Sequence, residues 1–204
     1  MRSTAFRLIL ISPPETTAAE LPTLQRLFGA GLQTLHLRKP SALVTEVEAY
    51  LQAVPQQYHR RIVLHSHYTL AQRYSVGGLH LPAAARATWQ KQARLRQPGV
   101  SLSTSFHSVT ELRQHRRQYD YVFLSPVFDS ISKQGYGQAF ALADLEKELQ
   151  RLRQRQQYVP QVVALGGITA DNVAQVRATG FAGAAVLGSV WQAADPVAAF
   201  RELR

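Results

Sequence analysis

The chain has 204 residues, 46% of them hydrophobic, and a formal net charge of +10 at neutral pH. This apolar content excludes a disordered chain, and no apolar run approaches the roughly 18 residues of a membrane span. The lack of cysteine excludes disulfides, a thiolate nucleophile and sulfur-ligated metals. We therefore expect a soluble, cytoplasmic protein that forms one domain over residues 1–204 and has no membrane partner.

Short apolar runs alternate with helix-like segments along the whole chain. The predicted strands are Arg7–Ile11, Gln33–Arg38, Arg61–His65, Gly77–Leu81, Gly99–Ser103, Tyr121–Leu124, Val162–Leu165 and Ala182–Leu187. The predicted helices are Leu21–Ala30, Val44–Ala53, Thr69–Tyr74, a polar helix ending at Gln97, Val109–Gln118, Ala141–Arg153, Ala170–Thr179 and Val190–Leu203. Eight repeats with short links predict parallel strands joined by right-handed crossovers. We expect an α/β fold, a single-domain (β/α)8 TIM barrel; the pattern also fits an open doubly wound sheet.

The excess positive charge lies mostly in Arg/Gln-rich helical segments, at residues 86–96, 113–117 and 151–155. Such segments are typical of the solvated outer faces of barrel helices. Nucleic-acid binding is the alternative, but no zinc-finger or RNA-recognition motif accompanies the charge. We expect a small-molecule substrate and no nucleic-acid partner.

Two glycine turns follow the last two predicted strands. Gly166 and Gly167 follow the seventh strand, and Leu187, Gly188 and Ser189 follow or end the eighth. Loops at these positions of (β/α)8 barrels often bind phosphate through backbone N–H groups, and glycine lets the backbone approach an anion closely. The turns predict a phosphate site; an ordinary turn is the alternative, because no complete nucleotide-binding motif is present.

A long irregular segment, residues 125–137, follows the sixth strand. Loops of this length on a barrel rim are often functional. Hydroxyl groups together with a lysine suit an oxyanion such as phosphate or pyrophosphate, and the candidates are Ser130, Ser132 and Lys133. A solvated loop without function is the alternative.

Five of the seven histidines lie at predicted strand ends, namely His36, His65, His67, His80 and His107. Active sites of (β/α)8 barrels form at that face, and imidazole can donate or accept a proton near neutral pH. Because Leu79 and Leu81 flank His80, we expect His80 to be structural, and we expect the other two histidines to lie on the surface. A three-histidine metal site is a minor alternative; no spacing specifies it, so no metal ligand is predicted.

Six short runs, each at a strand end, resemble the thiamine phosphate synthase/TenI family over nearly the whole chain. They are Leu35–Lys39, Gly78–Leu81, Ser105–Ser108, Ser125–Phe128 with Ser130–Lys133, Ala164–Ile168 and Val186–Ser189. The resemblance implies a (β/α)8 barrel. The family's synthase couples hydroxymethylpyrimidine pyrophosphate to carboxylated thiazole phosphate with Mg2+ and releases pyrophosphate, whereas TenI relatives act on thiazole phosphate, in one branch as a tautomerase.

Carried over by position, the resemblance implies substrate or phosphate contacts from Arg38, on the pyrophosphate side, and from Ser105, Ser130, Ser132 and Lys133. Lys39 adjoins Pro40, the position of a further synthase lysine. Gly167 and the Leu187-Gly188 turn match the cradle of the thiazole phosphate.

Other positions depart from the synthase pattern. His36 replaces a glutamine, His65-Ser66-His67 replaces a run that contains a magnesium-binding aspartate, and residues 82–85 offer no second carboxylate. The histidine of the tautomerase branch falls on Pro126. Because Mg2+ prefers oxygen ligands, we expect Mg2+ only if the chain is a synthase.

Three hypotheses follow from these observations. The preferred one is a thiamine-biosynthesis protein that binds thiazole phosphate and catalyses proton transfer on it, as a thiazole tautomerase does. Its candidate acids and bases are His36, His65, His67 and His107. The alternatives are a thiamine phosphate synthase and a non-catalytic binder of thiazole or thiamine phosphate. A homo-oligomer is compatible with all three.

Overall fold

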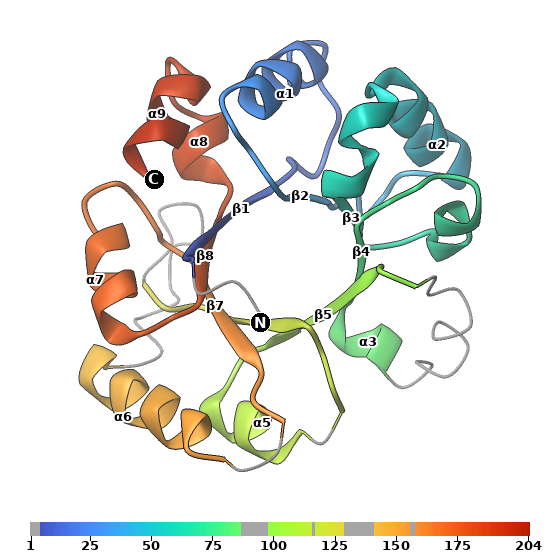
Figure 1. The fold of residues 1–204 in the computed structure, drawn as a ribbon. Helices are drawn as coiled ribbons and strands as arrows, with labels where there is room; N and C mark the ends of the chain where they lie inside the picture. The colour runs from blue at the N-terminus through green and yellow to red at the C-terminus, as the bar shows by residue number, and fades with distance from the viewer. Residues whose placement is uncertain (1–4, 87–97, 116, 129–140, 156–157) are drawn as a thin grey trace.

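Figure 1 shows the protein as a computed structural model, which describes residues 5–86, 98–115, 117–128, 141–155 and 158–204. Eight parallel strands close into a barrel in which each strand pairs with its neighbours in chain order and β8 pairs with β1. The strands are β1 Arg7–Ile11, β2 Leu35–Leu37, β3 Ile62–Leu64, β4 Gly78–Leu81, β5 Ser101–Phe106, β6 Tyr121–Leu124, β7 Gln161–Leu165 and β8 Gly183–Val186. The predicted (β/α)8 barrel is confirmed, and the open sheet is excluded.

Helices surround the barrel on the outside (Figure 1). They are α1 Glu20–Gly29, α2 Val44–Ala53, α3 Ala83–Arg86, α5 Val109–Gln114, α6 Leu142–Arg153, α7 Val173–Thr179, α8 Gly188–Trp191 and α9 Pro196–Glu202, with 3-10 helices at Gln56–Arg61 and Tyr68–Gln72. None of the helices within these described ranges is long and apolar enough to cross a bilayer.

Local residue chemistry sets the helix ends. Gly180, with φ of 94°, forms the C-cap of α7 at the predicted position, because a left-handed residue at this point costs glycine little. The single helix predicted over Val190–Leu203 is two helices instead. Asp195 caps the second one by accepting a hydrogen bond from the backbone N–H of Val197, and Pro196 occupies its first turn.

Two apolar layers hold the fold together. The larger lies between the strands and the helices and includes Leu27, Leu51, Val176 and Phe200, all at most 1% exposed. The smaller lies inside the barrel and consists of residues from β1, β6, β7 and β8, namely Ile9, Ile11, Tyr121, Phe123, Val163 and Ala185. Successive strand residues alternate between these layers. The inward positions of β2, β4 and β5 carry polar side chains, so one side of the barrel interior is polar.

Candidate active site

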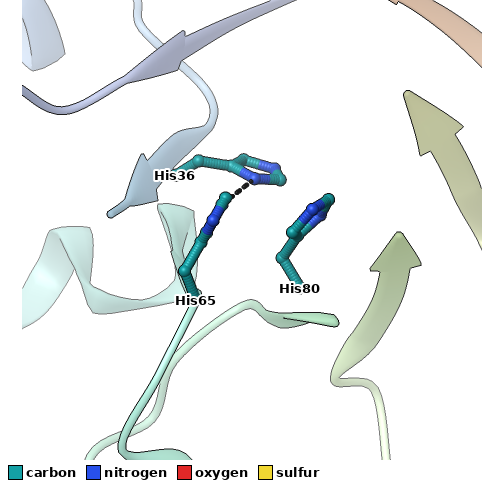
Figure 2. A group of neighbouring side chains, drawn as sticks. All are labelled: His36, His65 and His80. Carbon is teal, nitrogen blue, oxygen red and sulfur yellow. Dashed lines mark hydrogen bonds between the residues drawn. The ribbon is translucent and has the colours of Figure 1, made fainter. Parts of the chain in front are cut away.

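Three imidazole rings meet inside the barrel (Figure 2). His36 is the central residue of β2, His65 directly follows β3, and His80 lies in β4. Nδ1 of His36 lies 2.8 Å from Nε2 of His65, and the His65 ring stacks on the His80 ring with centroids 4.2 Å apart. His36 and His80 are 0% and 2% exposed, so these rings belong to the interior rather than to the rim.

Hydroxyl groups hold the outer sides of this histidine cluster. The Tyr121 hydroxyl lies 2.6 Å from Nε2 of His36. The hydroxyls of Ser103 and Ser105 lie 2.9 and 3.0 Å from Nδ1 and Nε2 of His80. Both rings are therefore fixed in orientation by partners on β5, which pairs with β4, and on β6, which pairs with β5.

Burial keeps the cluster uncharged. It lowers the pKa of His36, and proximity to His65 lowers it further. Burial, then the nearby charge of Arg38, lowers the pKa of His65 to about 3. Burial also lowers the pKa of His80 and raises that of Tyr121. All three imidazoles are thus neutral at neutral pH, and a neutral imidazole can accept a proton or bind a metal ion.

Of the four histidines predicted to be catalytic, only His36 and His65 come together. His67 has φ of 50°, and its Nε2 lies 2.8 Å from the carbonyl oxygen of Ala42. His107 is exposed, and its Nδ1 lies 3.3 Å from the carbonyl oxygen of Ser125. Neither contacts the cluster through a hydrogen bond or ring contact within the described residues.

The third member of the cluster is His80, which the sequence analysis assigned to a structural role. Its neighbours Leu79 and Leu81 point outward into the layer under the helices, so His80 between them must point inward. The sequence shows that His80 alternates with two leucines, but it does not show which of the two sets faces the barrel interior. Tyr121, Ser103 and the contact of Ser105 with His80 were missed for the same reason.

The glycine turns lie together on the adjacent ends of β7 and β8. Gly166 and Gly167 have φ of 101° and 63°. The Asn172 side-chain amide donates to the carbonyl oxygen of Gly167, while its Oδ1 accepts from the backbone N–H of Thr169. Backbone hydrogen bonds from Val127 to Leu165 and from Phe128 to Gly166 tie the start of the β6 loop to this turn.

Ser189 lies at the start of α8, next to Gly188. Its hydroxyl is buried and has no hydrogen-bond partner among the described residues. Buried hydroxyls nearly always have a partner, so the Ser189 hydroxyl is a candidate for contact with a ligand. Ser189 and the two turns lie on the rim where the sequence predicts a phosphate site.

Arg38 directly follows β2. Its backbone N–H donates to the hydroxyl of Ser12, which fixes the strand end, while its side chain is exposed. Within the described ranges no carboxylate forms an ion pair with its guanidinium. Its charge reaches the cluster, because it helps to lower the pKa of His65 and His80. Arg38 is therefore available to an anion at the mouth.

Lys39 does not face this mouth, contrary to its predicted role as a phosphate ligand. Its ammonium is buried and donates to Glu20 Oε2 at 2.6 Å and to the carbonyl oxygens of Pro13 and Glu15 at 2.9 and 3.0 Å. An ammonium has three N–H donors, so none is left for a ligand. The remaining candidates Ser130, Ser132 and Lys133 lie outside the described residues.

The donor set of the cluster does not suit Mg2+, the ion that the family resemblance implies. Mg2+ takes oxygen ligands, mostly carboxylates and water, whereas the three histidines offer nitrogen. One ligand nitrogen from each lies within 4.8 Å of the others. The cluster could therefore hold only a metal that accepts imidazole.

Comparison with known proteins agrees on one family. A family model described as thiamine monophosphate synthase matches residues 8–190. The chain is 32% identical to the thiamine-phosphate synthase of Klebsiella pneumoniae, covering 88% of this chain and 84% of that protein. It is 31% identical to the thiamine-phosphate synthase of Latilactobacillus sakei, covering 90% and 84%.

Solved structures agree with this result. The thiamine phosphate pyrophosphorylase of Bacteroides thetaiotaomicron superimposes with a TM-score of 0.77 at 30% identity, covering 97% of this chain and 95% of that one. The thiamine phosphate pyrophosphorylase of Pyrococcus furiosus, at 22% identity, has the same fold with a TM-score of 0.74, covering 98% and 94%. The chain belongs to the thiamine monophosphate synthase family.

Proposed function

We propose that this protein is a thiamine phosphate synthase, an enzyme that joins hydroxymethylpyrimidine pyrophosphate to thiazole phosphate and releases pyrophosphate. This choice departs from the tautomerase-like activity that the sequence analysis preferred. It is supported by relatives of about one-third identity, which are named as synthases. Membership of the family is compatible with both reactions. The geometry of the site supports the synthase reaction.

The observation that carries the proposal is a barrel mouth with two separate positions for anions. One is the rim after β7 and β8, with Gly167, Gly188 and the hydroxyl of Ser189, which has no hydrogen-bond partner among the described residues. The other is the exposed guanidinium of Arg38 at the end of β2. A reaction between two phosphorylated substrates needs two such positions, whereas isomerisation of one thiazole phosphate needs only the first.

The two positions have different chemistry, which suits different phosphate groups. Backbone N–H groups and one hydroxyl suit a phosphate that stays bound and is not transferred. A guanidinium binds the departing pyrophosphate with paired donors and stabilises charge as it develops. Ser130, Ser132 and Lys133, which match the family's residues after β6, would add donors on the pyrophosphate side.

The test is a synthase assay on the purified full-length chain with both substrates and either Mg2+ or Zn2+. Thiamine phosphate and pyrophosphate are expected in equal amounts. Arg38→Gln is expected to raise the KM for the pyrimidine pyrophosphate by about 10-fold, the loss of one charge-assisted contact, and to leave the KM for thiazole phosphate unchanged. No product with either metal, while thiazole phosphate still binds, would overturn the proposal.

A second candidate is proton transfer on carboxylated thiazole phosphate, which the His36–His65 hydrogen bond favours. A neutral imidazole within hydrogen-bond distance of a second one can take up a proton and pass it on. In this case the protein would convert the thiazole substrate with no pyrimidine present. Proton NMR of that single substrate with wild type and His65→Ala separates the candidates, since only isomerisation proceeds without the pyrimidine and stops in the variant.

A further inference from the structure

We propose that His36, His65 and His80 form a binding site for one transition-metal ion of the zinc class, in place of the magnesium site of the family. The three residues come from β2, the end of β3 and β4, and one ligand nitrogen from each lies within 4.8 Å of the others. The proposal stands on this geometry and does not depend on which of the two reactions is catalysed.

Binding of such an ion would require the ligand nitrogens, which lie within 4.8 Å of one another, to adjust their spacing. Zinc bound to imidazole at about 2.0–2.1 Å with tetrahedral angles places its ligand nitrogens about 3.4 Å apart. The His36–His65 pair, at 2.8 Å, would open by about 0.6 Å to reach that spacing. His65 would also turn out of its stack on His80, where the centroids are 4.2 Å apart.

The hydrogen bond between His36 and His65 shows that one of these two nitrogens already directs a lone pair toward the centre of the cluster. Two ring nitrogens can share a hydrogen bond only if one of them carries no proton. A metal ion binds to that unprotonated form. The N–H of the partner ring would move to that ring's other nitrogen, so that this imidazole also binds the ion in its neutral form.

The outer partners of two of the rings are those of a metal site. A histidine ligand usually donates its other ring N–H to an oxygen, which fixes the ring and its tautomer. Tyr121 occupies this position on His36, at 2.6 Å, and Ser103 occupies it on His80, at 2.9 Å. With Nδ1 of His36 and Nε2 of His80 as ligands, both of these hydrogen bonds would persist, and the ion would replace the Ser105 hydroxyl that lies 3.0 Å from Nε2 of His80.

The donor types decide the class of metal. Three imidazoles suit zinc, cobalt, nickel or iron(II), whereas Mg2+ requires oxygen ligands. The positions at which the family resemblance places magnesium-binding aspartates hold Ser66 and the segment 82–85. Three protein ligands leave one position of a tetrahedral ion open to water or a substrate oxygen.

The test is a metal titration of the full-length chain after chelator treatment, with no substrate present. Cobalt(II) is expected to give the intense visible bands of a four-coordinate ion at one equivalent per chain, to be displaced by Zn2+ and to be unaffected by Mg2+. His65→Ala is expected to weaken Zn2+ binding by more than about 100-fold, and Tyr121→Phe by about 10- to 100-fold as an outer partner. His107→Ala, outside the cluster, is the matched control and keeps wild-type affinity.

His65→Ala is the variant of choice because His65 is the least buried of the three. Circular dichroism checks that it folds. X-ray absorption of the wild-type zinc protein gives a result without any variant, since three nitrogens at about 2.0 Å are expected. A shell of oxygen ligands only, or equal zinc affinity in wild type and His65→Ala, would overturn the proposal. Because no substrate is present, failure here is distinct from failure of the synthase assay.

Discussion

Nδ1 of His36 and Nε2 of His65 lie 2.8 Å apart, although 29 residues separate them in the chain. The parallel pairing of β2 with β3 brings them together, because His36 is aligned with Val63 and His65 follows two residues later. This contact joins the Tyr121 hydroxyl on one side to the His80 ring on the other. It joins these four side chains into one unit on the polar side of the barrel interior.

The uncharged cluster predicts acid-sensitive stability in the metal-free protein. In the unfolded chain these histidines bind protons below a pH of about 6.5, whereas folded His65 does so only near its pKa of about 3. The unfolded state therefore holds more protons between these values, and the free energy of unfolding falls as the pH drops below 6.5. Each histidine contributes a slope of about 1.4 kcal/mol per pH unit. Urea unfolding at pH 7.5, 6.5 and 5.5 measures it.

The His65→Ala variant is the control for this prediction, because it removes one titrating group. Its dependence of stability on pH is expected to be shallower by the contribution of that one histidine. Equal stability of the wild-type protein at pH 7.5 and pH 5.5 would contradict neutral burial of the cluster.

Substitution of Lys39 is expected to affect stability rather than ligand binding. Lys39→Met leaves the Glu20 carboxylate, which is 0% exposed, without its counter-ion. Removing one partner of a buried pair costs about 3–5 kcal/mol, measured by urea unfolding. Calorimetric titration with thiazole phosphate at a temperature where the variant is folded is expected to show unchanged affinity.

Two control variants test whether the loss of stability comes from the buried Lys39–Glu20 pair. Arg26→Met breaks the exposed pair with Asp195 at 3.5 Å and is expected to cost less than about 1 kcal/mol. Lys39→Met combined with Glu20→Leu removes both charges and is expected to recover most of the lost stability. A loss of phosphate affinity with wild-type stability in Lys39→Met would restore its predicted role as a phosphate ligand.

Ser189→Ala is expected to weaken ligand binding without changing stability, which is the reverse of the result expected for Lys39→Met. The hydroxyl has no partner among the described residues, so its removal costs the fold nothing. Loss of one hydrogen bond to a charged phosphate weakens binding of thiazole phosphate by about 10-fold, measured by calorimetry. Ser108→Ala is the matched control: that hydroxyl caps α5 by accepting from the Glu111 N–H, so the variant loses about 1 kcal/mol and keeps its affinity. Unchanged affinity in Ser189→Ala would exclude Ser189 from the phosphate site.

Gly166→Ala is expected to destabilise the protein by about 1–3 kcal/mol, because its φ of 101° is strained for any side chain. A Cβ atom there would also lie 2.9 Å from the Cα of Pro126, a backbone atom that cannot move aside easily. Gly188→Ala is the control, since its Cβ would meet only the flexible end of Gln192 at 3.3 Å. Thermal unfolding compares the two variants. Equal melting temperatures would show that the segments after β6 and β7 accommodate the added Cβ without loss of stability.

Features that depend on local chemistry could be predicted from the sequence. Apolar runs and helical spacing predicted the barrel, because each strand must bury its own side chains. Gly180 predicted the end of α7 because glycine adopts φ of 94° without strain. The turn at Gly166 and Gly167 was predicted for the same reason, although its binding of phosphate stays a prediction.

Only the tertiary structure decided which polar side chains share the interior. His36 and His80 point inward because of the phase of two short strands, and a shift by one residue would have turned both rings toward the helices. Lys39, one residue beyond Arg38, instead faces Glu20 outside the barrel. The physical reason is that strand phase and barrel closure depend on pairing between distant segments, whereas spacing along one segment records only that segment's own periodicity.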